Sequence, residues 1–119
     1  MKVLIIDDSL IMRKAVERSL ADKGFTIIGT AGDGEEGLRL FKENLPDLVT
    51  LDISMPKMDG VTCLREILKV KSDAKVLMIT SQTDNLTSQE VLGMGAAGVL
   101  GKPFNAEQIL AKANEIVGK

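Results

Sequence analysis

The sequence predicts a doubly wound α/β domain, in which helices cover both faces of a five-stranded parallel sheet. Two observations predict this fold class. Short runs rich in valine and isoleucine alternate with longer amphipathic stretches, and the short runs are apolar almost throughout rather than at every second position. Continuous apolar character is typical of strands covered on both faces, and strands alternating with helices favour parallel pairing with right-handed crossovers. We therefore expect a β–α unit repeated five times within one domain, residues 1–119.

The expected strands are the five short apolar runs. They are Val3–Ile6, Phe25–Gly29, Leu48–Leu51, Val76–Ile79 and Ala97–Leu100. Apolar residues at helical spacing mark five helices in the stretches 12–20, 38–41, 61–68, 86–94 and 109–117. Asn105 followed by Gln108 predicts a capping box at the start of the last helix, and Gly24 and Gly95 suit the ends of two others.

The segment Gly93–Gly98 matches the glycine pattern of dinucleotide-binding loops, but its context is wrong for that function. Such a loop follows a strand and opens a helix, whereas here a helix ends and a strand follows. We therefore interpret these glycines as a helix end and a tight turn.

Composition excludes several function classes. The chain has no histidine and a single cysteine, Cys63, so a Ser-His-Asp mechanism, a histidine-ligated metal site and an internal disulfide framework are all excluded. The net charge is −2 and no basic run occurs, so we expect no nucleic-acid partner. We also expect no membrane segment or signal peptide, and a cytoplasmic location.

Polar residues follow four of the predicted strands. They are Asp7 and Asp8, then Asp52, then Thr80, and finally Lys102. In open α/β sheets, ligands bind beyond the carboxyl ends of the strands, so these side chains are expected to converge. Each residue alone has another explanation: Asp8 as a helix cap, Asp52 as a loop acid, Thr80 as a strand former and Lys102 as surface charge.

Together, the acids indicate a site for a cation and a phosphoryl group. Three carboxylates at adjacent strand ends repel one another unless a cation lies among them, and oxygen ligands with water suit Mg²⁺. Lys102 would add a fixed positive charge and Thr80 a hydroxyl donor. Asp52 stands alone after the central strand, so we expect it to be the nucleophile that forms an acyl phosphate.

The chain also resembles bacterial two-component response-regulator receiver domains along nearly its whole length. The resemblance rests on several segments in order: Val3–Ser9, Pro46–Asp52, Met55–Gly60, Thr80-Ser81, Gly95-Ala96 and Lys102–Phe104. It implies a flavodoxin-like fold with strand order 2-1-3-4-5, a stand-alone and monomeric receiver, and a role in phosphorelay signalling such as chemotaxis.

The resemblance implies a role for each matching residue. Asp52 would be the phosphoacceptor, Asp8 a direct Mg²⁺ ligand, Asp7 a ligand through water, and the backbone carbonyl of Ser54 a further ligand. Thr80 would be the switch hydroxyl. Lys102 would pair with the phosphoryl group, and the Lys102–Pro103 peptide bond would be cis. Ser54 and Gln82 occupy the positions that tune autodephosphorylation in the family.

Three positions depart from the family pattern. Val99 replaces an aromatic residue that couples to the switch hydroxyl, and it would instead be a core strand residue. Gly101 beside the lysine would loosen that loop. Gly37 replaces alanine in the second helix and should lower helix stability by about 1 kcal/mol.

The leading functional hypothesis is a signalling switch that takes its phosphoryl group from a histidine kinase. It would catalyse only its own phosphorylation and autodephosphorylation. It would contact a downstream protein through the face formed by the fourth helix, fifth strand and fifth helix. One alternative is an aspartyl-phosphate phosphatase, although such enzymes commonly need an acid two residues after the nucleophile, where this chain has Ser54. The other is a phosphate sink or a binding module independent of phosphorylation.

Overall fold

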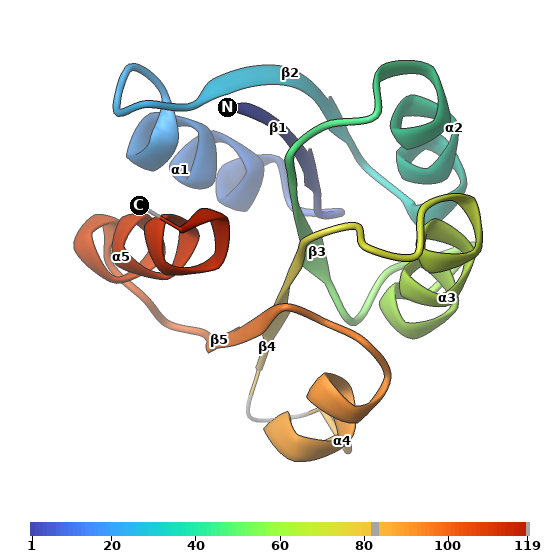
Figure 1. Cartoon of the computed structure of the whole chain (residues 1–119). Coiled ribbons are helices and arrows are strands. Elements are labelled where there is room, and N and C mark those ends of the chain that lie inside the picture. Colours follow the sequence, from blue (N-terminus) through green and yellow to red (C-terminus); the bar gives the residue numbers. More distant parts are fainter. Residues whose placement is uncertain (82–83, 119) are drawn as a thin grey trace.

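The computed structural model describes residues 1–81 and 84–118, and in this part of the chain five strands pair in one parallel sheet. The order is β2-β1-β3-β4-β5, as predicted (Figure 1). The strands are β1 Lys2–Ile6, β2 Thr26–Ala31, β3 Leu48–Asp52, β4 Val76–Thr80 and β5 Gly98–Gly101. The helices are α1 Leu10–Leu20, α2 Gly34–Asn44, α3 Gly60–Val70, α4 Ser88–Gly93 and α5 Ala106–Val117.

The sheet separates two apolar layers. Alternate residues of each central strand point to opposite faces, so Val3 and Ile5 of β1 pack in one layer and Leu4 and Ile6 in the other. The first layer contains α1 and α5, and the second contains α2, α3 and α4 (Figure 1). This double cover explains why the central strands are apolar at nearly every position.

The edge strand β2 differs from this expectation. It runs from Thr26 to Ala31 rather than from Phe25 to Gly29, and most of its residues are partly or fully exposed. The sheet order gives β2 a neighbour on one side only, so its faces are less completely covered. Phe25 lies just outside the strand and is buried in the layer of α1 and α5.

Side-chain caps fix where the helices begin. Ser9 caps α1 by accepting a hydrogen bond from the Met12 N–H, so the alternative in which Asp8 serves as the cap is wrong. Asp33 and Asp59 cap α2 and α3 in the same way. The predicted capping box of Asn105 and Gln108 is present at α5. Because Ser9 caps α1, the Asp8 carboxylate is not needed for that role.

The helix α4 is shorter than its apolar pattern predicts. It spans only Ser88–Gly93, so Leu86 precedes it and Met94 follows it. Gly95 then adopts a φ of +106°, and β5 begins at Gly98. The order of helix, turn and strand confirms that the glycine-rich segment is not a dinucleotide-binding loop.

Gly37 is required by packing. A Cβ at this position would lie 2.5 Å from Cδ1 and 2.9 Å from Cγ1 of the buried Ile6. Glycine lets α2 approach β1 closely, so its low helix propensity is offset by contact between the two elements. The expectation that Gly37 only weakens the helix is therefore incomplete.

Cys63 lies on the buried face of α3. Its thiol is fully buried and lies 3.6 Å from the Gly34 carbonyl oxygen, which accepts its weak hydrogen bond. Burial, followed by the nearby negative charges of Asp33 and Asp59, raises the pKa of Cys63 to about 12. The thiol is therefore protonated and poorly reactive in the native fold.

The membrane prediction can be checked against the helices. Among the described residues, no helix combines the length and apolar character needed to cross a bilayer.

Candidate functional site

Three aspartates meet at the carboxyl edge of β1 and β3. Asp7 and Asp8 follow β1 directly, Asp52 is the last residue of β3, and the two strands are neighbours in the sheet. One carboxylate oxygen from each residue lies within 4.8 Å of the other two. Asp7 and Asp52 are buried, at 2% and 5% exposure, whereas Asp8 is exposed. Asp52 is thus a buried strand residue rather than a loop acid.

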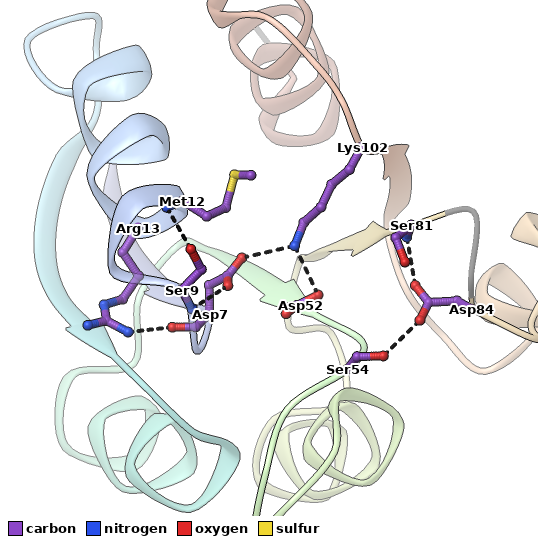
Figure 2. Close-up of polar contacts among 9 residues, drawn as sticks. All are labelled: Asp7, Ser9, Met12, Arg13, Asp52, Ser54, Ser81, Asp84 and Lys102. Carbon is purple, nitrogen blue, oxygen red and sulfur yellow. Dashed lines mark hydrogen bonds and ion pairs between the residues drawn. The ribbon is translucent and has the colours of Figure 1, made fainter.

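Lys102 reaches this cluster from the end of β5. Its Nζ lies 3.5 Å from Oδ1 of Asp52 and 3.6 Å from Oδ2 of Asp7 (Figure 2). The Lys102 backbone N–H donates to the Thr80 carbonyl oxygen at 2.6 Å, which joins the end of β5 to the end of β4. The Lys102–Pro103 peptide bond is cis, as expected. Lys102 is therefore not merely a surface charge, because it pairs with two buried carboxylates.

The charge balance of the cluster is unfavourable. Burial, and then the negative charge of Asp7, raises the pKa of Asp52 to about 6, although Lys102 opposes the shift. Burial also raises the pKa of Asp7, against a hydrogen bond from the Ser9 N–H and the charge of Lys102. One ammonium group thus faces three carboxylates, and further positive charge would stabilise the ionised cluster.

Two contacts hold the loop that carries Asp7 and Asp8. The Ser9 N–H donates to Oδ1 of Asp7 at 2.9 Å, and Nη1 of Arg13 donates to the Asp7 carbonyl oxygen at 2.6 Å (Figure 2). Arg13 also lies against Gly32, where a Cβ would stand 3.2 Å from Nη1. The guanidinium therefore joins the loop after β1 to the loop after β2.

Thr80 and Ser54 lie beside the cluster. Thr80 is the last residue of β4, and among the described residues the side chain of Asp52 receives its hydrogen bond from Lys102 rather than from Thr80. Ser54 follows Asp52 by two residues, and its hydroxyl donates to Asp84 at 2.8 Å. An open groove of about 620 Å³ runs past these groups, with Asp8, Ser54 and Asp84 in its lining.

Sequence reasoning located part of this arrangement. Asp7, Asp8, Asp52 and Lys102 come together as the strand-end argument predicted. Arg13 and Asp84 were missed, because a single charged residue in a helix or loop carries no signal without its partner. Gln82 lies outside the described residues.

The segment 3–114 matches the family described as response regulator receiver domain. The chain belongs to this family. Within this receiver, the acidic cluster of Asp7, Asp8 and Asp52 lies at the carboxyl ends of β1 and β3.

Individual relatives of this receiver differ in length. The chemotaxis protein CheY of Bacillus subtilis is 34% identical over 96% of this chain and 95% of its own length. The probable C4-dicarboxylate response regulator DctR of the same organism is 40% identical over 91% of this chain but only 48% of its own length. Receivers similar to this one thus occur both alone and within longer proteins.

A solved structure gives the same fold. A chain in the crystal structure of the CheX-CheY-BeF3-Mg²⁺ complex from Borrelia burgdorferi superposes with a TM-score of 0.93 and 37% identity. The match covers 100% of this chain and 90% of that chain. The flavodoxin-like receiver fold and the similarity to CheY are therefore established.

The position of Val99 in the receiver is also clear. Val99 is partly buried and packs against the apolar layer of α2, α3 and α4. The interpretation of Val99 as a strand residue facing the core is confirmed.

Proposed function

We propose that this receiver accepts a phosphoryl group on Asp52. The observation that supports it is the Asp52 carboxylate, buried at the strand edge, 3.5 Å from Lys102 Nζ and grouped with two further carboxylates. A carboxylate oxygen would attack phosphorus, forming an acyl phosphate while the bond from phosphorus to the donor breaks. With no histidine in this chain, a histidine kinase is the proposed donor.

The residues of the cluster fit Mg²⁺. Three carboxylates with one ammonium group leave excess negative charge, and oxygen donors are the ligands that this ion prefers. Asp7, Asp8 and Asp52 would hold the ion, together with the backbone carbonyl of Ser54. When bound, Mg²⁺ would neutralise charge on the transferring phosphoryl oxygens.

Lys102 and Thr80 would respond to the new group. Phosphorylation adds about −1.5 to −2 charges, which would draw the Lys102 ammonium and the Thr80 hydroxyl toward the phosphoryl oxygens. Thr80 ends β4 and Lys102 directly follows β5, and the chain continues from both into the surface of α4, β5 and α5, so a movement here would change that surface. A downstream protein would read the change, and the solved complex of CheY with CheX is consistent with a protein as the target.

The remaining features of the proposal concern the whole chain. We propose that residues 1–119 form one receiver domain that acts as a monomer in the cytoplasm, without nucleic acid or membrane as a partner. It would modify only itself rather than turn over a substrate. A chemotaxis pathway is one proposed setting, by analogy with CheY.

Intact-mass spectrometry tests this function. After incubation with acetyl phosphate and Mg²⁺, the wild-type chain should gain one phosphoryl group, whereas Asp52→Ala should gain none. Asp73→Ala is a matched control, because Asp73 is an exposed acid before β4 and should leave labelling unchanged. A wild type that gains no group, or an Asp52→Ala variant that is labelled, would contradict the proposal.

The same incubation separates a switch from an enzyme. Release of inorganic phosphate would be followed over time in a separate sample. Repeated turnover with a generic phosphate ester would support a phosphatase, whereas one transient group per chain would support the switch.

A further inference from the structure

The Asp84 carboxylate joins the loops that follow β3 and β4. Its Oδ1 accepts a hydrogen bond from the Ser54 hydroxyl at 2.8 Å, and its Oδ2 accepts one from the Ser81 backbone N–H at 2.7 Å. The Asp84 N–H also donates to the Ser81 carbonyl oxygen at 3.2 Å. Figure 2 shows Asp84 between Ser54 and Ser81, with both side-chain bonds drawn. We call these two bonds the Asp84 bridge.

The bridge begins and ends next to the proposed phosphoryl site. Ser54 lies two residues after Asp52, and Ser81 directly follows Thr80. Asp84 and Asp8 line the same groove. The bridge therefore fixes the position of Ser81, which follows Thr80 at the end of β4, relative to the loop after Asp52.

We propose that Asp84 is a positioning residue whose bridge holds Thr80 and Ser81 in the resting arrangement and opposes binding of an oxyanion at Asp52. This inference rests on the proposed function. In the structure, the Asp52 side chain is hydrogen-bonded to Lys102 and not to Thr80, so the contact between Thr80 and a phosphoryl group that the proposed function calls for is not formed in the resting arrangement. The bridge connects Ser81, next to Thr80, to the loop that carries Ser54, so Thr80 cannot shift relative to that loop while both bonds are intact.

The chemistry of the bridge suits this role. Hydrogen bonds to a carboxylate are stronger than those between neutral groups, so two of them in one side chain make a rigid connection. The bond from Ser54 is exposed and the bond from Ser81 is only partly buried, so the bridge can break without unfolding the domain. Loss of the bridge would therefore shift the resting equilibrium rather than the fold.

Three variants separate the bridge from the charge. Asp84→Ala removes both bonds. Asp84→Asn keeps an oxygen for the Ser81 N–H and a nitrogen for the Ser54 hydroxyl, but removes the charge. Ser54→Ala removes one bond and retains the Ser54 backbone carbonyl. Asp73→Ala removes an exposed acid remote from the groove and serves as the control.

The test is a titration of each protein with beryllofluoride in the presence of Mg²⁺, followed by NMR of the backbone amides. Asp84→Ala should bind beryllofluoride at least about tenfold more tightly than wild type, the effect expected from losing hydrogen bonds to a charged group. Ser54→Ala and Asp84→Asn should show smaller gains, because Ser54→Ala keeps one bond and Asp84→Asn keeps two weaker, neutral ones, while Asp73→Ala should match wild type. Unchanged or weaker binding by Asp84→Ala would overturn the inference, as would equal gains in Asp84→Ala and Asp84→Asn.

Hydrogen exchange of the Ser81 amide provides a second readout that needs no beryllofluoride. Exchange should be faster in Asp84→Ala than in wild type, with a smaller increase in Asp84→Asn, whose bond to the Ser81 N–H is neutral. Equal exchange in wild type and Asp84→Ala would show that the bridge does not exist in solution. A wild type that never binds beryllofluoride would instead count against the proposed function, so the two failures can be told apart.

Discussion

At the scale of single residues, the Asp52 carboxylate combines two opposing requirements. Burial and neighbouring negative charge raise its pKa to about 6, yet a phosphoacceptor has to be ionised to act as a nucleophile. Lys102 and a bound cation both favour the ionised form. The ionised Asp52 carboxylate is thus destabilised by its surroundings. Added positive charge, or conversion of the carboxylate to an acyl phosphate, would remove this destabilisation.

This raised pKa predicts an unusual dependence of stability on pH. Because the folded pKa exceeds the unfolded value of 3.8, the folded state holds its proton more tightly, and stability falls as pH rises between about 4 and 6. Without divalent cations, wild type should lose about 1–2 kcal/mol of unfolding free energy from this group between pH 5 and pH 7.5. Asp52→Asn should lack this loss.

Urea titrations at each pH would measure the unfolding free energy. Circular dichroism would follow unfolding, because the chain has no tryptophan or tyrosine for fluorescence. Chelator should be present throughout, and Asp73→Asn is the exposed control. Parallel pH profiles for wild type and Asp52→Asn would argue against the shift.

At the scale of elements, close packing of α2 on β1 decides the effect of Gly37. Alanine has the better helix propensity, by about 1 kcal/mol, but its Cβ would meet the Ile6 side chain at 2.5 Å. We therefore expect Gly37→Ala to destabilise the protein by about 1–2 kcal/mol, since overpacking in a core outweighs propensity. The double variant Gly37→Ala, Ile6→Val should recover part of the loss, because it removes the nearest methyl group.

Gly93→Ala is the matched control for this experiment. Gly93 is also a helical glycine, but among the described residues no atom beyond its chain neighbours and its own helix backbone lies within 4 Å of the position of its Cβ, so the substitution should be neutral or stabilising. Chemical denaturation would rank the three variants. A Gly37→Ala protein as stable as wild type would show that Ile6 repacks freely.

The helix α4 is the element with the weakest anchorage. It has six residues, and Val91 is the one it buries, while the capping box of Thr87 and Glu90 supplies its first hydrogen bonds. So short a helix is marginal without its cap. Thr87→Ala should therefore increase hydrogen exchange in 88–93 severalfold while leaving exchange in α3 unchanged. An equal increase in both helices would indicate global rather than local opening.

The degree of burial explains how accurately the sequence predicted the bounds of each element. Strands buried on both faces and helices with a clear apolar stripe were located to within a few residues, because burial determines their pattern. The edge strand β2 and the short helix α4 were placed to within two residues, whereas α2 begins four residues before the stretch 38–41 and ends three residues after it, because its first turn consists of glycine and acidic residues. The acidic cluster was predictable from strand ends alone. The Asp84 bridge and the Arg13 contact were not, since each depends on loop geometry that no periodic pattern records.

At the scale of the whole molecule, the cluster should couple global stability to divalent cations. A ligand that binds only the folded state stabilises it by about 2.7 kcal/mol at a concentration 100 times its dissociation constant. Added Mg²⁺ should thus raise the melting temperature of wild type by several degrees. Asp8→Asn should lose most of this rise with little change in the melting temperature without cation, because Asp8 is exposed.

Calorimetry with increasing MgCl2 would measure the shift, with NaCl at matched ionic strength as the control for screening. An equal rise for wild type and Asp8→Asn would mean that the ion acts elsewhere.

The buried thiol of Cys63 has a practical consequence for studying this chain. The chain contains one cysteine, and that side chain is enclosed on the buried face of α3 beside the start of α2, so an alkylating reagent can reach it only when α3 opens. Alkylation rates at low reagent should then report the population of the open form, and Mg²⁺ should slow them in wild type but not in Asp8→Asn. The native thiol would thereby report opening of the fold, with no engineered cysteine.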